Sequence, residues 1–362
     1  MNKLYPIKFT PIEHETIWGK ETYVISDLGV IDSIATNGWL EGNGIGDIIE
    51  TYLEKIVGEE VFNLYGRQLP IQIKILELND RISLQVNPDD EIAAQMYDCL
   101  GKSKLWYILE TKDEAQIYLG LKEESNAREL YDLCLTGNIE SKLNSIKVKK
   151  GDAFYVPSGT IHSASAGLKI LEIAEASELN LRLYDWGRND SKRELHLEDA
   201  IDLINYKAYD PSLNLKPHNH DFLLSDAPEF NITKLVLTDT LHIYSENYKS
   251  FIIYTCIEGE AHIEIQKEEK YSLTKGESIL IPAGMEDFYL VSDSCSAILL
   301  ESYLKVEEKI DNYIDPTTEA FLEGEDYGGL EEEEEEEEED FDGEEHGDHE
   351  HSKNCHCCHH EH

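Results

Sequence analysis

The chain has 362 residues and is strongly acidic, with 75 Asp and Glu against 31 Lys and Arg and a formal net charge of -44. This balance argues against binding to nucleic acid or to an anionic membrane surface. No apolar run reaches the roughly 18 residues that a membrane span requires, and the opening MNKLYPIKFTPI lacks the apolar core of a signal peptide. We therefore expect a cytoplasmic protein that is long enough for two domains.

In chain order, the first predicted helix covers residues 44–58, GIGDIIETYLEKIVG. Further helices are predicted at residues 126–137, where Asn126 can cap the first turn and Gly137 can end the helix, and at residues 195–206. Asp89 and Asp90, after Pro88, are typical of a helix N-terminus, where carboxylates suit the positive end of the dipole. Between the helices, short segments rich in Ile, Leu, Val and Tyr predict strands at residues 69–78, 82–86, 104–110, 115–121, 151–159 and 168–176.

A second strand-rich block runs from about residue 235 to residue 304 and repeats the pattern of the first. KVKKGDAFYVPSG and YSLTKGESILIPAG both place a basic residue before Gly-Asp or Gly-Glu, then a strand that ends in Val-Pro or Ile-Pro, then a Gly-containing turn. The sequence therefore predicts two copies of one small antiparallel barrel, most simply a double-sheet jelly roll.

The C-terminal segment, residues 306–362, has a different composition. It contains an unbroken glutamate run at residues 331–339 and ends GDHEHSKNCHCCHHEH, which cannot supply an apolar core, so we expect it to be disordered. Its Cys and His residues are ligands that Zn, Ni and Cu(I) favour, which predicts metal chelation in the tail, although an acidic end that only aids solubility is the alternative. The predicted tail ligands are His346, His349, His351, Cys355, His356, Cys357, Cys358, His359, His360 and His362.

Several motifs in the body of the chain occur together and in a fixed order: LPIQIKILELNDRISLQVNPDDEIA, GKSKLWYIL, GDAFYVPSGTIHSASAG and LEIAEASELNLRLYDWGR. In them the chain closely resembles the type I mannose-6-phosphate isomerases in their short bacterial form. The resemblance implies a mostly β protein with two cupin jelly-roll domains and a small helical insertion, followed by the disordered acidic tail. The expected boundaries are residues 1–205 for the first cupin with its insertion around 124–146, 206–234 for a connecting segment, 235–305 for the second cupin and 306–362 for the tail.

The same resemblance implies a zinc site in the first cupin. The family holds zinc with the His of Gln-x-His-Pro-Asp-Asp, the Glu of Gly-Lys-x-Glu and the His of Pro-x-Gly-Thr-x-His, often with the Gln as a further ligand. At the matching positions this chain has Asn87, Lys104, His162 and Gln85, so two principal ligands are replaced. The expected site is therefore a weak one built from Gln85, Asn87 and His162.

Two further residues carry over with other roles. Arg182 matches the arginine to which the family assigns a catalytic role, and strand alternation against Leu181 and Leu183 points its side chain into the barrel lumen. Lys102 matches a lysine of the family's substrate pocket. We therefore predict Arg182 as catalytic, and Lys102 together with Lys104 as substrate-binding.

Lys104 is the residue most at odds with a metal ion. At about 4 Å and an effective dielectric constant near 20, an ammonium group and a divalent cation repel by about 8 kcal/mol. Three outcomes are open: the lysine swings into solvent, it ligates the metal as a neutral amine, or its ammonium occupies the place of the metal as a fixed charge.

Two functions follow from these observations. The first is a mannose-6-phosphate isomerase that interconverts mannose 6-phosphate and fructose 6-phosphate. Such an aldose–ketose isomerisation needs acid–base groups and a group that stabilises an oxyanion. The alternative is a catalytically degenerate cupin that binds a sugar phosphate and is coupled to metal handling through its tail. Both have a small-molecule sugar phosphate as partner, and the sequence identifies no protein partner.

Overall fold

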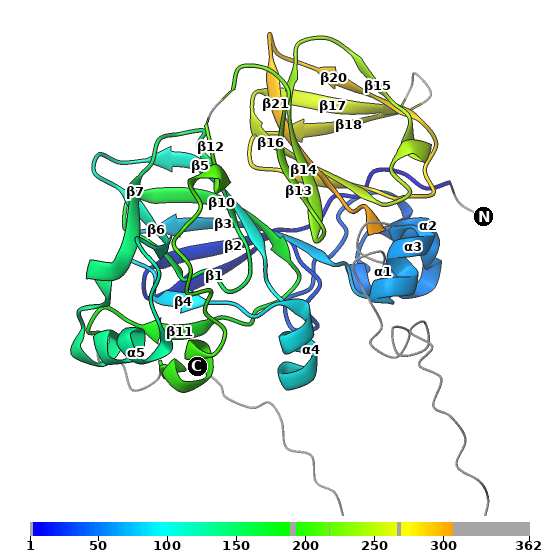
Figure 1. The fold of residues 1–362 in the computed structure, drawn as a ribbon. Coiled ribbons are helices and arrows are strands. Elements are labelled where there is room, and N and C mark those ends of the chain that lie inside the picture. The colour runs from blue at the N-terminus through cyan, green and yellow to red at the C-terminus, as the bar shows by residue number, and fades with distance from the viewer. Residues whose placement is uncertain (1–2, 189–192, 217, 266–268, 307–362) are drawn as a thin grey trace, which may run out of the picture. The chain divides into compact units, whose positions relative to one another are not determined.

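The computed structural model describes residues 3–188, 193–216, 218–265 and 269–306. Within these residues the strands form four sheets that make up two barrels (Figure 1). The expected mostly β architecture with two jelly-roll barrels is confirmed. The tail residues that we predict to chelate metal lie outside the described residues.

The first barrel consists of a seven-stranded and a five-stranded sheet. The larger sheet has the order β1 (Ile12–Thr16), β2 (Gly19–Ile25), β3 (Ile71–Leu78), β10 (Leu168–Glu175), β5 (Lys104–Thr111), β8 (Ala153–Val156) and β12 (Asn214–Leu215). The smaller sheet has the order β11 (Leu181–Tyr184), β4 (Leu84–Val86), β9 (His162–Ala164), β6 (Gln116–Leu121) and β7 (Leu143–Lys147).

The second barrel repeats this topology with a five-stranded and a four-stranded sheet. One sheet has the order β13 (Phe222–Ala227), β14 (Phe230–Leu237), β21 (Ala297–Tyr303), β16 (Ile252–Glu258) and β19 (Ser278–Ile281). The other has β15 (Leu241–Ile243), β20 (Phe288–Ser292), β17 (Glu260–Ile265) and β18 (Glu269–Thr274). The strand order β3-β10-β5-β8 thus recurs as β14-β21-β16-β19, and β4-β9-β6-β7 recurs as β15-β20-β17-β18, as the repeated sequence pattern predicts. Residues 206–234, which the sequence suggested to be a connection, contain paired strands: β12 pairs with β8 of the first barrel, and β13 begins the second barrel.

Six short helices lie outside the sheets in the part of the chain that the structure describes. The first predicted helix is broken into α1 (Ile45–Tyr52) and α2 (Glu54–Val57), with α3 (Glu59–Tyr65) after it; the others are α4 (Asp90–Tyr97), α5 (Ala127–Thr136) and α6 (Leu197–Ile201). Single 3-10 turns occupy η1 (Gly38–Leu40), η2 (Ile139–Lys142), η3 (Pro211–Leu213) and η4 (Ser245–Asn247). None of the described helices is long and apolar enough to cross a membrane.

The predicted helix ends are confirmed at α4 and α5. The Asp89 side chain accepts the Ile92 N–H at 2.9 Å, and the Asn126 side chain accepts the Glu129 N–H at 3.1 Å. Helix α6 is shorter than predicted and ends at residue 201, because the Asn205 N–H bonds to the Gly159 carbonyl at 2.8 Å and draws the chain away from the helical path.

Alternation along β3 separates two apolar clusters. Ile71, Ile73 and Ile75 pack outward into a buried cluster that also contains Ile253, Leu280 and other residues of the second barrel, so the two barrels share a core. The opposite face of β3 points into the first barrel, where Leu76 packs with Trp106 and with residues of the facing sheet. Gln72 and Lys74 lie on this lumen face as well.

Candidate active site

Two rows of side chains face each other across the lumen of the first barrel. On the smaller sheet, Arg182 of β11 pairs with Gln85 of β4, which pairs with His162 of β9. On the larger sheet, Glu172 of β10 stands between Lys74 of β3 and Trp106 of β5. Cross-strand neighbours lie close enough for their side chains to interact, so register alone gathers these residues.

A cavity of about 270 Å³ opens between the two rows. Its lining includes Gln85 and Arg182 of one row, all three residues of the other row and part of the β1–β2 hairpin. The lining residues that carry charge or hydrogen-bonding groups are His14, Thr16, Trp18, Glu21, Tyr23, Lys74, Ser83, Gln85, Lys102, Trp106, Glu172, Glu178, Asn180, Arg182 and Arg193. The predicted orientation of the Arg182 side chain into the lumen is thus confirmed. A pocket of this size with convergent cations suits a small anionic ligand.

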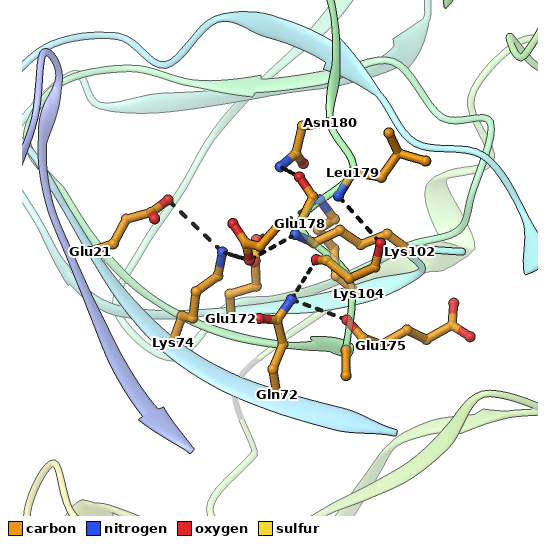
Figure 2. Close-up of polar contacts among 12 residues, drawn as sticks. Glu21, Gln72, Lys74, Lys102, Lys104, Glu172, Glu175, Glu178, Leu179 and Asn180 are labelled. Carbon is orange, nitrogen blue, oxygen red and sulfur yellow. Dashed lines mark hydrogen bonds and ion pairs between the residues drawn. The ribbon is translucent and has the colours of Figure 1, made fainter. Parts of the chain in front are cut away.

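Three lysines and three glutamates form a cluster at the base of the lumen, and all of them except Lys104 line the cavity: Lys74, Lys102, Lys104, Glu21, Glu172 and Glu178 (Figure 2). We call it the lysine–glutamate cluster. All three lysines are at most 2% exposed. Buried charges of this kind require partners, because the loss of hydration costs several kcal/mol per ion. The equal number of carboxylates meets that requirement.

Lys74 is the best-compensated member of the lysine–glutamate cluster. Its Nζ lies 3.1 Å from Glu178, 3.5 Å from Glu172 and 3.9 Å from Glu21. Burial disfavours its charge, but the three carboxylates outweigh burial and raise the pKa of Lys74 well above the usual value. Burial likewise acts against ionised Glu178, yet Lys102 and Lys74 lower the pKa of that carboxyl to about 2. The pair is therefore ionised at neutral pH.

Lys102 has fewer protein contacts. Its nearest carboxylate is Glu178 at 3.6 Å, and its buried Nζ makes no hydrogen bond to any described residue. Burial lowers the pKa of Lys102. An ammonium that faces a cavity with unused N–H groups is suited to receive acceptor oxygens from a ligand.

The loop before β5 fixes the position of Lys102. The Asp90 side chain accepts the Gly101 N–H at 2.9 Å, and the Lys102 N–H bonds to the Pro88 carbonyl at 3.1 Å. A Cβ on Gly101 would lie 2.5 Å from the backbone N of Asp90, so only glycine permits this approach. The predicted helix N-terminus at Asp89 and Asp90 thus also serves as the anchor of the lysine-bearing loop.

Lys104 is fully buried and does not line the cavity. Its Nζ donates to His162 Nε2 at 3.1 Å and lies 4.0 Å from Glu172. The possibility that Lys104 swings into solvent is therefore wrong, because β5 is an interior strand of the sheet and leaves its first residue enclosed. Burial lowers the pKa of Lys104 to about 7, although Glu172 opposes the effect.

His162 is held in one tautomer. Its Nδ1–H donates to the Thr160 carbonyl at 2.8 Å, so Nε2 carries the lone pair and accepts from Lys104 and, at 3.2 Å, from Gln85. Trp106 packs edge-on against the ring at 5.4 Å. Burial, followed by the nearby Lys104 charge, lowers the pKa of His162 well below its usual value, so the ring is neutral.

These residues do not fit a zinc ion. The Asn87 amide nitrogen donates to the Leu179 carbonyl at 2.6 Å and to Asn180 Oδ1 at 2.9 Å, which leaves Asn87 Oδ1, a weak donor to zinc, without a hydrogen bond from the described residues, and the lone pair of His162 is already hydrogen-bonded. Within the described residues, no group of three or more His, Cys, Asp and Glu is arranged to hold a metal ion. The structure therefore brings Gln85, His162 and Lys104 together without forming a zinc ligand set.

Arg182 occupies the opposite wall of the cavity. Its Nε–H donates to the Glu194 carbonyl at 2.9 Å, which fixes the plane of the guanidinium while the group still lines the cavity. Arg193 stands beside it and donates to Ser83 at 2.9 Å; Ser83 in turn donates to Asp185 at 2.6 Å. The wall thus presents two guanidinium groups to the cavity.

Several residues of the site escaped the sequence reasoning: Lys74, Glu21, Glu172, Glu178, Ser83 and Arg193. A signal existed for two of them. In IQIKILEL and LKILEIAE, a lysine and a glutamate interrupt apolar strands on the face that alternation assigns to the lumen. Charged residues on a buried strand face are rare without a partner, so each predicts the other.

In the described residues of the second barrel, an apolar cluster occupies the space between the sheets. The position of Glu172 corresponds to Glu301 in the repeated topology, and Glu301 accepts hydrogen bonds from Tyr248 and Tyr254, both at 2.8 Å. Tyr254 and Phe288 are completely buried in the apolar cluster of this barrel. Side chains therefore fill the space that is a cavity in the first barrel.

Two jelly-roll barrels, one with a polar lumen and one with an apolar core, define a two-domain cupin protein. Residues 221–301 match the family model described as mannose-6-phosphate isomerase, cupin domain. The chain is 30% identical over 312 residues to mannose-6-phosphate isomerase ManA of Bacillus subtilis (strain 168), with 79% of this chain and 95% of that protein covered. The chain belongs to the mannose-6-phosphate isomerase family.

Two further matches agree. A mannose-6-phosphate isomerase of Streptococcus mutans is 29% identical over 268 residues, which cover 72% of this chain and 82% of that protein. The crystal structure of the mannose 6-phosphate isomerase from Bacillus subtilis superposes with a TM-score of 0.71 at 26% identity, covering 83% of this chain and all of that one. The resemblance inferred from the motifs is thus confirmed over most of the chain.

Proposed function

We propose that the protein interconverts mannose 6-phosphate and fructose 6-phosphate, with the lumen of the first barrel as its sugar-phosphate site. The observation that carries the proposal is the cavity itself: Arg182 and Lys102 line one space, and the Lys102 Nζ faces it without a hydrogen bond from the described residues. Family membership supplies the class of reaction, an aldose–ketose isomerisation.

Within this proposal, Arg182 is the catalytic residue and Lys102 binds substrate. Isomerisation moves a proton between C1 and C2 of the sugar and develops negative charge on an oxygen, which a fixed guanidinium stabilises. The bond from Arg182 to the Glu194 carbonyl holds that group in place before substrate arrives. Lys104 was predicted to contact substrate directly; since it lies behind the cavity lining, we assign it no such contact.

The residues of this barrel are poor ligands for the zinc ion that the resemblance implies. Gln85, Asn87 and His162 would be its donors, and none of them is a carboxylate or thiolate. We propose that this set binds zinc far more weakly than the three-ligand site of the family, and no step of the reaction is assigned to the metal.

The tail is a separate matter, and its proposal stands on the sequence alone. Seven His and three Cys between residues 346 and 362 offer mixed N and S ligands, so the tail is proposed to bind Zn or Ni. Mass spectrometry of bound metal on the full chain and on a chain that ends at residue 325 tests this; equal stoichiometry in the two contradicts it. A cytoplasmic location is proposed on the same footing.

A coupled assay tests the function. The product fructose 6-phosphate is converted to glucose 6-phosphate and measured by NADP reduction, with mannose 6-phosphate as the substrate. We expect turnover in the parent and a loss of at least about 100-fold in Arg182→Ala, while Arg67→Ala, at an exposed arginine paired with Glu50, leaves turnover unchanged. If the parent converts no substrate but binds mannose 6-phosphate in calorimetry, the degenerate sugar-phosphate-binding cupin is the correct description.

A further inference from the structure

The amino group of Lys104 and the imidazole of His162 form a hydrogen bond that is buried at the base of the lumen. The Nδ1–H bond from His162 to the Thr160 carbonyl leaves Nε2 as an acceptor, and Lys104 Nζ lies 3.1 Å from that atom. A metal ion that bound His162 would have to take the same lone pair. The one strong metal ligand of this set is therefore already engaged by the lysine.

The other side of Lys104 is equally well defined. Glu172 Oε2 lies 4.0 Å from its Nζ and also accepts the Trp106 indole N–H at 2.8 Å, while Glu172 Oε1 lies 3.5 Å from Lys74. Each oxygen of the carboxylate thus has a cationic or N–H partner. Lys104 sits between an imidazole and this carboxylate, in a space that is closed to solvent.

We propose that the Lys104 amino group permanently takes the place of a divalent metal against His162, so that the first barrel is a metal-independent form of its fold. The lysine–glutamate cluster then supplies an internal, charge-balanced floor for the cavity. Zinc cannot enter without breaking the Lys104–His162 contact and placing a divalent ion beside a lysine. As a statement about catalysis, the inference rests on the proposed isomerase function; as a statement about metal binding, it does not.

Thermal unfolding of the full chain tests metal binding to the barrel. A ligand that binds the native and unfolded states equally does not change the thermal midpoint. The Cys and His residues of the tail are close in sequence, so they bind metal in both states, and metal held by the tail changes the midpoint little. We expect the midpoint of the parent to be the same, within about 1 °C, in EDTA and in excess Zn²⁺. A clear rise of the parent midpoint in Zn²⁺ overturns the proposal.

Two variants sharpen the test. Asn87→His restores one family ligand but keeps Lys104, so we expect no response to Zn²⁺. The double variant Asn87→His/Lys104→Glu removes the blocking amine as well, and we expect Zn²⁺ to raise its midpoint by at least about 5 °C. If Asn87→His alone responds as strongly as the double variant, Lys104 does not exclude the metal and the proposal is wrong.

A second measurement does not depend on whether the double variant folds. In parent protein labelled with ¹⁵N-histidine, the signals of His162 are identified by their loss in His162→Gln. We expect them to keep the neutral Nδ1–H pattern at a Zn²⁺ excess that shifts the tail histidines. A metal-bound Nε2 signal for His162 contradicts the proposal.

The catalytic arm is separate. If the parent is an isomerase, its turnover after exhaustive EDTA treatment should remain within about twofold of the untreated value, since no step needs zinc. Turnover that is abolished by EDTA and restored by Zn²⁺ overturns the inference but supports the isomerase function. Absence of turnover in every sample removes the isomerase function, and the unfolding and NMR results still decide metal binding.

Discussion

Lys74 is predicted to be the residue on which the stability of the lumen depends most. It faces three carboxylates within 4 Å, and Lys74→Met keeps the aliphatic stem while removing the charge. The lysine–glutamate cluster would then hold three carboxylates against two lysines. Removing one partner of a buried ion network costs about 3–5 kcal/mol, which for a protein of this size lowers the thermal midpoint by roughly 5–8 °C.

The pH dependence of this loss has a definite sign. The pKa of Glu178 is lowered in the native state to about 2, and that of Glu172 is lowered further, so their contribution to stability is present above the unfolded value and is lost as the pH falls toward 2. Part of that contribution comes from Lys74. The difference between the parent and Lys74→Met should therefore be largest near neutral pH and shrink below about pH 4.

The assay is urea or thermal unfolding of the parent, Lys74→Met and Lys74→Met/Glu178→Gln. The double variant restores the balance of charge and should recover at least half of the loss. As a control, Lys147→Met breaks an exposed pair with Glu114 and should cost less than about 1 kcal/mol. The reasoning fails if Lys74→Met is as stable as the control, or if the second substitution makes it less stable.

Three other substitutions have expected outcomes. Burial raises the pKa of Asp27 to about 6, although its carboxylate accepts the Leu69 N–H at 2.7 Å. The free energy of unfolding of the parent should therefore fall by up to about 3 kcal/mol as the pH rises through 6. Asp27→Asn should gain stability relative to the parent between about pH 4 and 7 in urea titrations, and a pH-independent difference contradicts this. Gly101→Ala should cost about 1–3 kcal/mol and raise KM, because its Cβ would meet the backbone of Asp90 at 2.5 Å; an unchanged KM contradicts the anchoring role. Asn126→Ala should cost about 0.5–2 kcal/mol by thermal unfolding without affecting turnover, whereas Asn126→Asp should be close to neutral.

Much of the fold could be predicted because its causes are local. The caps at Asp89 and Asn126 depend on side chains that bond within three residues, and the lumen orientation of Arg182 follows from alternation along one strand. The two barrels could be predicted from the repeated pattern of Gly and Pro residues at the ends of strands. The break between α1 and α2 was not, since it occurs at Leu53, whose φ of 52° interrupts an otherwise continuous helical pattern.

The lysine–glutamate cluster could not be predicted in the same way. Lys74 and Glu172 are cross-strand neighbours, but their register depends on how β3 and β10 pair across almost a hundred residues of intervening chain. Glu178 comes from the loop after β10, and no periodicity places a loop side chain between two lysines. The sequence left three fates for Lys104; the enclosure of β5 within the sheet removed one of them.

The replacement at residue 104 is consistent with the net charge of the site. In the family that the sequence resembles, a glutamate stands at the position of Lys104, and that carboxylate with a zinc ion carries one net positive charge. Lys104 in its protonated form carries the same net charge beside Glu172. Without a metal ion, a histidine at position 87 has no ligand role. Asn87 instead donates hydrogen bonds to Leu179 and Asn180 and so holds the loop beside the cavity. Only the replacement at position 104 bears on the charge of the site, because the exchange of a neutral imidazole for a neutral amide at position 87 changes no charge.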